Sequence, residues 1–153
     1  MAFTFKFQSI LDLKIRLEDQ KKSKYGEANE ELKRQQDKLN VLFEEREYQF
    51  SIMREKGKTG LTPKELIVYN NYMERLKRSI EIQNVVVEKA KKAVEAARLE
   101  LVEAAKQRKM FETLKEKKLE EYWEDYYKKE QASLDEIVSY KYNGGVKDGE
   151  KSG

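Results

Sequence analysis

The 153-residue sequence contains no cysteine, no histidine and only one proline. The lack of cysteine excludes disulfides and thiolate metal sites. The lack of histidine removes both the commonest general base and the commonest metal ligand. The sequence also has no run of about 18 apolar residues and no signal-peptide pattern at its start. We therefore expect a soluble intracellular protein that is not an enzyme and binds no cofactor and no metal.

Charge is abundant, since 40% of the residues are charged and 39% are hydrophobic. This ratio is too polar for an ordinary globular core. Disorder is also disfavoured, because the net charge is only +3 and the 29 acidic residues are interspersed with 32 basic ones. Such a mixture is typical of solvated helix faces carrying surface ion pairs.

The second half of the sequence has a heptad pattern. Two apolar series repeat every seven residues: Leu66, Met73, Ile80, Val87, Val94 and Leu101, and Tyr69, Leu76, Gln83, Ala90, Ala97, Ala104 and Phe111. Such a repeat predicts one narrow seam facing a partner helix in a left-handed coiled coil. Gln83 is the one polar residue of this seam, and we expect it to fix the register.

The first half has a matching series, which ends before Gly57. It comprises Tyr25, Ala28, Leu32, Gln35, Leu39, Leu42, Arg46 and Met53. Nearer the start, four apolar residues follow a different frame: Phe3, Phe7, Ile10 and Leu17. The two frames disagree between Lys21 and Tyr25, which predicts a stutter in the supercoil there.

The stretch GKTGLTPKEL, residues 57–66, separates the two series and resembles the end of a phosphate-binding loop. A GxxxxGK[ST] loop needs a glycine five places before Gly57, where this sequence has Ile52. It also needs a preceding buried strand, whereas the residues here are charged at helical spacing. We therefore interpret the stretch as a turn between two helices.

Each residue of this turn has a structural role in that interpretation. Gly57 and Gly60 can end a helix through a positive φ. Thr62 is the expected N-cap of the next helix, and Glu65 completes a capping box with it. Pro63 falls at the first helical position, where the missing N–H costs nothing.

Together these patterns predict an all-α fold, a long antiparallel two-helix coiled-coil hairpin with unequal arms. The predicted hairpin occupies residues 1–142, with helix one over about 4–56, a tip at 57–62 and helix two over about 63–140. At 1.5 Å per residue the helices would be about 75 and 115 Å long, so that residues from about 117 to 140 overhang. Residues 143–153 are rich in glycine and charge and are predicted to be a disordered tail.

The predicted overhang contains EEYWEDYYKKE, in which Tyr122 pairs with Tyr126 and Trp123 with Tyr127 at i,i+4 spacing. Four large rings on an unpartnered helix favour a docking surface. Two alternatives are that helix one shields them and that the rings pack on each other. The preceding segment, residues 106–118, has six cations and two anions. Its acidic interruptions favour a solvated face or an acidic protein partner over nucleic acid, which we do not expect as a partner.

Two segments resemble a known family. FKFQSILDLKIRLEDQKK, residues 5–22, is similar to the start of bacterial flagellar export proteins of the FliJ family. VYNNYMERLKRSIEIQ, residues 68–83, resembles the aromatic-x-x-aromatic-x-x-x-leucine segment on helix two of that family. The length, the tip position and the longer second helix also agree, so the resemblance covers about residues 1–140.

The resemblance implies a cytoplasmic accessory subunit of the flagellar type III export apparatus, peripherally associated with the inner face of the membrane at the flagellar base. Proteins of this family form a hairpin similar to the central stalk of rotary ATPases. The implied partners are a hexameric export ATPase, the membrane export gate and export chaperones, and the free subunit is expected to be a monomer.

Carried onto matching positions, the resemblance assigns two binding surfaces. Export-gate binding would involve Leu42, Tyr72, Leu76, Ser79 and Gln83. ATPase-ring binding would involve the two termini of the hairpin, with Phe3, Phe5, Phe7, Tyr122, Trp123, Tyr126 and Tyr127. Helix one departs from the family where exposed tyrosines are expected below Leu42, because this chain has Glu45 and a shifted Tyr48.

A coiled-coil chaperone or homodimeric scaffold unrelated to flagella is the main alternative. An intramolecular hairpin predicts a monomer whose helicity does not depend on concentration, whereas a scaffold would unfold as it dissociates.

Overall fold

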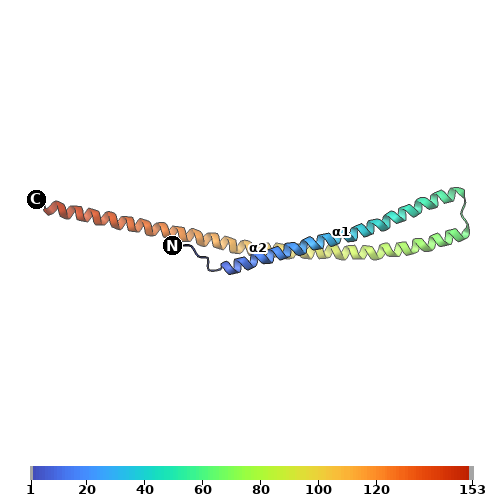
Figure 1. Ribbon diagram of the computed structural model, residues 1–153, viewed down its shortest axis with the longest axis horizontal. Coiled ribbons are helices and arrows are strands. Elements are labelled where there is room, and N and C mark those ends of the chain that lie inside the picture. Colours follow the sequence, from blue (N-terminus) through green and yellow to red (C-terminus); the bar gives the residue numbers. More distant parts are fainter. Residues whose placement is uncertain (1, 152–153) are drawn as a thin grey trace. The chain divides into compact units, whose positions relative to one another are not determined.

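The computed structural model describes the backbone of residues 2–151 and the side chains of residues 2–144. Two helices account for most of it, α1 (Gln8–Thr59, 52 residues) and α2 (Pro63–Lys151, 89 residues). The predicted all-α class with two long packed helices is confirmed (Figure 1). The chain divides into two units, Arg16–Ala105 and Met1–Ile15 with Lys106–Gly153. Among the described residues, no helix is long and apolar enough to cross a membrane.

Within Arg16–Ala105, α1 and α2 lie side by side and run antiparallel. Three contacts link the helices, and the α2 partner number falls as the α1 number rises: Lys21 with Glu100, Gln35 with Gln83 and Glu45 with Tyr72. The buried side chains of α2 in this unit are Leu76, Ile80, Val87, Ala90 and Ala104. All of them belong to the two heptad series read from the sequence, because a seven-residue repeat keeps one side of the helix facing its partner.

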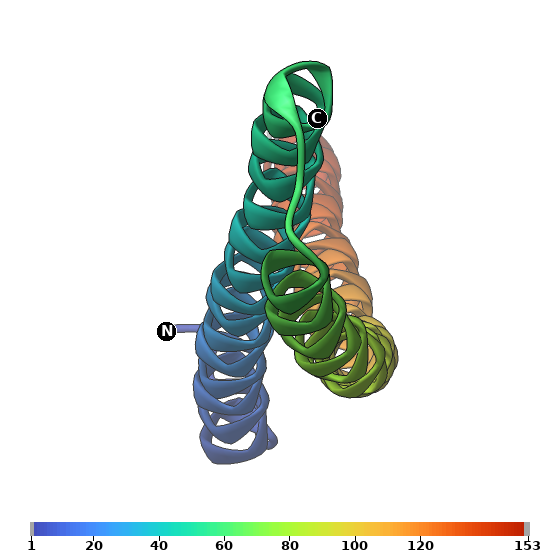
Figure 2. The same cartoon turned by 90° about the vertical axis from the view of Figure 1, so that its right-hand side faces the viewer.

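The turn between the helices is shorter than predicted, because α1 continues through Gly57 to Thr59. Gly57 lowers helix stability by only about 1 kcal/mol, which a packed helix tolerates. The helix ends at Gly60, which has a φ of 105° and donates its N–H to the carbonyl of Lys56 at 3.0 Å. Only glycine adopts such a φ without a steric cost, so this residue sets the reversal. Figure 2 shows the turn facing the viewer, between the end of α1 and the start of α2.

The start of α2 is held by side chains of its first turn. The Glu65 N–H donates to Thr62 Oγ1 at 3.2 Å, and the Thr62 N–H donates to Glu65 Oε2 at 3.4 Å. These are the two reciprocal bonds that define a capping box. Pro63 is the first helical residue, and its fixed φ suits that position.

The predicted stutter in α1 is wrong. The buried residues in the first part of α1 are Leu11 and Glu18, seven places apart, and Tyr25 continues this spacing. Ile10, which suggested another frame, is 39% exposed. The apolar pattern was misleading because polar residues occupy seam positions, and Glu18 is compensated by Lys22 at 3.1 Å.

The C-terminal end of α2 also differs from the prediction, which placed it near Tyr140 and a disordered tail at residues 143–153. In the structure α2 extends to Lys151. The glycines after Asn143 weaken a helix, but no proline follows to block it. Residues 152 and 153 of the predicted tail lie outside the described residues.

Candidate functional site

The extended N-terminal segment brings phenylalanines to α2 within the unit formed by the two ends of the chain. The Phe3 ring lies 5.6 Å from the Tyr122 ring, and Phe5 lies 5.9 Å from Phe7. Phe5 is only 6% exposed and accepts the Gln8 N–H on its carbonyl at 3.2 Å, so it anchors the segment where α1 begins. The structure therefore brings together Phe3 and Tyr122, which are 119 positions apart in the sequence.

Four rings on α2 form a continuous aromatic cluster. Trp123 is its centre, with ring centroids 5.5 Å from Tyr122, 5.6 Å from Tyr126 and 6.0 Å from Tyr127. Tyr126 and Tyr127 are 5.8 Å apart. Three of these pairs are arranged edge to face, whereas the Trp123 and Tyr127 rings are tilted by 31°. Such arrangements are attractive, which reduces the cost of exposing the rings. Trp123, Tyr126 and Tyr127 nevertheless remain 45, 40 and 62% exposed, so mutual packing leaves them accessible.

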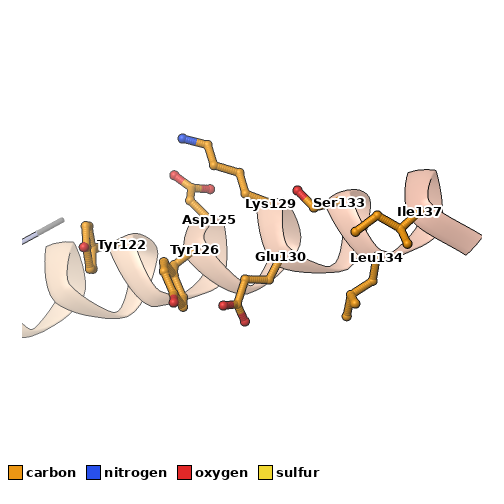
Figure 3. A pocket seen from close by; sticks show the side chains of 8 residues that line it. All are labelled: Tyr122, Asp125, Tyr126, Lys129, Glu130, Ser133, Leu134 and Ile137. Carbon is orange, nitrogen blue, oxygen red and sulfur yellow. The ribbon is translucent and has the colours of Figure 1, made fainter.

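The tyrosine face of the cluster continues along α2 into a shallow groove of about 610 Å³ (Figure 3). Its apolar lining comes from Tyr122, Tyr126, Leu134 and Ile137, and its polar lining includes Asp125, Lys129, Glu130 and Ser133. A hydrogen bond with Glu130 raises the pKa of the Tyr126 hydroxyl above its ordinary value. Every described side chain from residue 123 to residue 143 is exposed, so this part of α2 has no partner helix over it among the described residues.

The five residues assigned to the export gate have different environments. Leu76 is 6% exposed and belongs to the seam. Gln83 is half-buried and donates to both the carbonyl of Gln35, at 2.9 Å, and its side-chain oxygen, at 2.8 Å. These two side chains stabilise the helix pair, and little of them is left to contact a partner. Ser79 is exposed, and its hydroxyl donates to the Arg75 carbonyl at 3.1 Å.

Leu42 and Gln83 lie together at a shallow groove of about 450 Å³, which the exposed Val41 also lines. Tyr72 does not line this groove. Its hydroxyl instead donates to Glu45 Oε1 at 2.8 Å, and Gln49 Nε2 donates to the same oxygen at 3.0 Å. The hydrogen bond from Gln49, which has the larger effect, and the bond from Tyr72 both lower the pKa of Glu45. The bond to Glu45 in turn raises the pKa of Tyr72.

Two residues near this surface make contacts that were not predicted from the sequence. Glu45 was noted only as a departure from the family, although it holds the Tyr72 hydroxyl. Its spacing of four from Gln49 was a usable signal, since side chains at i and i+4 meet on a helix. Arg46 has a buried Nε with no hydrogen-bond partner among the described residues, while its guanidinium lies 5.0 Å from the Phe43 ring centroid.

The described residues contain no group of three histidine, cysteine, aspartate or glutamate side chains that could hold a metal ion. The exposed features with specific geometry are instead the aromatic cluster and the surfaces near the turn, both of which are suited to binding proteins.

Comparison with known proteins identifies the family. Searches of curated proteins and of solved structures found no match. The family model described as flagellar FliJ protein matches residues 3–147 of the 153-residue chain. This match includes the N-terminal phenylalanines, both heptad series and the aromatic cluster. The chain therefore belongs to the flagellar FliJ protein family.

Proposed function

We propose that this chain is a binding subunit of the flagellar export apparatus, acting as a stalk that contacts a hexameric export ATPase at one end and the membrane export gate near the other. The observation that carries the proposal is the family match over residues 3–147. The chain would act as a monomeric antiparallel hairpin with unequal arms, at the inner face of the membrane at the flagellar base. Export chaperones are further proposed partners.

The aromatic cluster is the proposed ATPase-binding surface. It has three strongly exposed rings, Trp123, Tyr126 and Tyr127, and the N-terminal Phe3 packs against its edge. Tryptophan and tyrosine are the residues that most often dominate protein interfaces. A single helix with its side chains is about 10–12 Å wide and two helices side by side are about 20 Å wide, so either would be narrow enough for the bore of a protein ring. Contacts made there would act on ATP hydrolysis by favouring one conformation of the ring over another.

Leu42, Tyr72 and Ser79 carry the proposed gate contact. Ser79 is exposed, and Leu42 and Tyr72 are partly exposed and line shallow grooves, whereas Leu76 and Gln83 are engaged in the seam. Leu76 and Gln83 would therefore support the surface by positioning the helices. Substituting them would disturb the helix pair as well as binding, so they are poor probes of contact.

The ATPase proposal is tested with the cognate export ATPase, by measuring hydrolysis and ring formation with and without this chain. A Trp123→Ala/Tyr127→Ala variant should lose most of the effect. Val41→Ala/Tyr48→Ala is the matched control, because it removes two exposed apolar side chains from α1. No effect of the wild-type chain on either measurement, or an equal loss in both variants, would refute the assignment.

The gate proposal is tested by binding of the purified gate domain to Ser79→Lys and Tyr72→Ala variants, with helicity checked by circular dichroism. Weaker binding at unchanged helicity is expected, and normal binding would contradict the assignment. Sedimentation velocity over a dilution series separates a monomer from the alternative homodimeric scaffold. Concentration-dependent mass and helicity would favour the scaffold.

A further inference from the structure

A third groove lies beside the turn, between the last turns of α1 and the first turns of α2. Its volume is about 530 Å³. Ile52 and Met53 line it from α1, and Val68 and Tyr69 line it from α2. Val68 is 61% exposed, so apolar surface is open to solvent at this point. A groove between two helices with an apolar floor is a common binding site for a short peptide segment.

The charged side chains of this groove are mostly cationic. Lys56, Lys64 and Arg75 line it, and none of the three forms an ion pair within the part of the chain that the structure describes. Glu65 is the one acidic residue of the lining, and its carboxylate already accepts the Thr62 N–H. The three cations outnumber the one carboxylate of the lining, so the groove carries an excess of positive charge around an apolar floor.

The position of Lys64 supports a binding role. It is the second residue of α2, where the unpaired backbone N–H groups form the positive end of the helix dipole. A cation there opposes the dipole, so Lys64 does not favour the helix start. Lys56, in contrast, lies in the last turn of α1, where a cation is favourable. Helix stability thus accounts for Lys56 but not for Lys64.

Tyr72 borders the same groove, and its hydroxyl is held by Glu45 at 2.8 Å. The hydrogen bond restrains the ring and directs the acidic Glu45 carboxylate toward Tyr72. One edge of the groove is thereby a restrained aromatic surface. A restrained aromatic wall lowers the entropic cost of binding an apolar side chain.

We propose that this groove binds an acidic segment of a partner protein, which inserts an apolar side chain over Val68 and Tyr69 and pairs its carboxylates with Lys56, Lys64 and Arg75. The inference deepens the gate-facing part of the proposed function and rests on it only for the identity of the partner. Charge complementarity favours an acidic segment, since the cations of the lining outnumber its one carboxylate and would repel a basic segment. A protein segment fits the groove better than an anionic membrane, because the apolar floor is concave and lies between the helices.

The test uses a fluorescein-labelled 15-residue peptide with leucines at every third or fourth position and glutamates between them. The first control peptide replaces each glutamate by lysine, and the second replaces each leucine by serine. Fluorescence anisotropy with the full-length chain should show binding of the glutamate–leucine peptide and at least about tenfold weaker binding of both controls. Equal affinity for the lysine peptide would overturn the proposal.

A Lys64→Glu/Arg75→Glu variant should weaken binding of the glutamate–leucine peptide by about tenfold or more. Lys89→Glu/Lys92→Glu is the matched control, because it reverses two exposed α2 cations that do not line the groove and should change affinity less than about twofold. Lys64→Glu favours the helix dipole, so this variant should not unfold more easily on that account. Equal loss of affinity in both double variants would overturn the proposal.

Two further results distinguish this proposal from a membrane-binding role and from the gate assignment. Binding to anionic lipid vesicles, without binding to the peptide, would overturn the proposal in favour of a membrane. Normal gate binding by the Ser79→Lys variant would refute the gate assignment, yet it would leave the peptide result standing. The peptide assay contains no flagellar protein, so its failure is distinguishable from failure of the export proposal.

Discussion

Replacing Gln83 tests how the polar layer of the seam contributes to stability. Gln83 makes two hydrogen bonds to Gln35, and each is worth about 0.5–1.5 kcal/mol net. Gln83→Leu removes both and leaves the Gln35 side-chain oxygen without its donor. The half-buried leucine recovers about 1 kcal/mol through apolar burial. We expect the free energy of unfolding to fall by about 1–2 kcal/mol.

The double variant Gln35→Leu/Gln83→Leu should behave differently, because it removes both partners and leaves no amide unsatisfied. Two half-buried leucines then offset the lost hydrogen bonds, so we expect stability within about 1 kcal/mol of the wild type. Urea denaturation followed by circular dichroism measures the three midpoints. A single variant as stable as the double one would refute the reasoning, since the hydrogen bonds would then contribute nothing measurable.

Three further predictions concern other parts of the chain. Thr62→Ala should lower the free energy of unfolding by about 1 kcal/mol in urea denaturation, whereas Thr62→Ser should retain the cap, and equal stability of both would contradict the capping role. Phe5→Ala should release the N-terminal segment from α2 and so increase the iodide quenching of Trp123, the only tryptophan. Unchanged quenching would show that Phe5 does not order this region. Glu45 has a pKa below its ordinary value of 4.5, so its hydrogen bonds stabilise the folded state above pH 4.5, and this contribution disappears as the pH falls through the lowered pKa. Tyr72→Phe should therefore weaken the fall of the melting temperature in acid, and an unaltered acid profile would count against the Tyr72–Glu45 bond.

The elements with local chemical signals were predictable from the sequence. The start of α2 depends on Thr62, Pro63 and Glu65, whose roles require only neighbouring residues. The α2 seam was predictable for a similar reason, because a seven-residue repeat identifies a buried side without knowledge of the partner. Leu76 and Val87 are accordingly buried.

The errors arose where polar residues occupy buried positions or where glycine is tolerated. Glu18 is buried in α1, and no apolar pattern can reveal a seam position held by a carboxylate. Gly57 and Gly60 are indistinguishable as helix ends from sequence alone, because the choice between them depends on how far packing sustains α1.

The candidate surfaces were predicted less completely than the fold. The aromatic residues of α2 were identified from spacing, but the contact of Phe3 with Tyr122 depends on how an extended segment returns to the helix. The bond between Glu45 and Tyr72 also crosses from one helix to the other. Such contacts depend on the register in which α1 and α2 pair. The hydrophobic repeat alone does not fix this register, because sliding one helix along the other by seven residues would again match apolar positions.

The turn at Gly60, which has a positive φ, is a suitable point at which to divide the chain into two separate helical peptides. A side chain built at Gly60 would meet no atom within 4 Å, so this residue contributes conformation and no packing. Separate peptides for the two helices would keep every seam contact and lose only the tether, which supplies an effective concentration on the order of millimolar. Mixing such fragments would convert folding into a bimolecular reaction, and the strength of the seam could then be read directly as a dissociation constant.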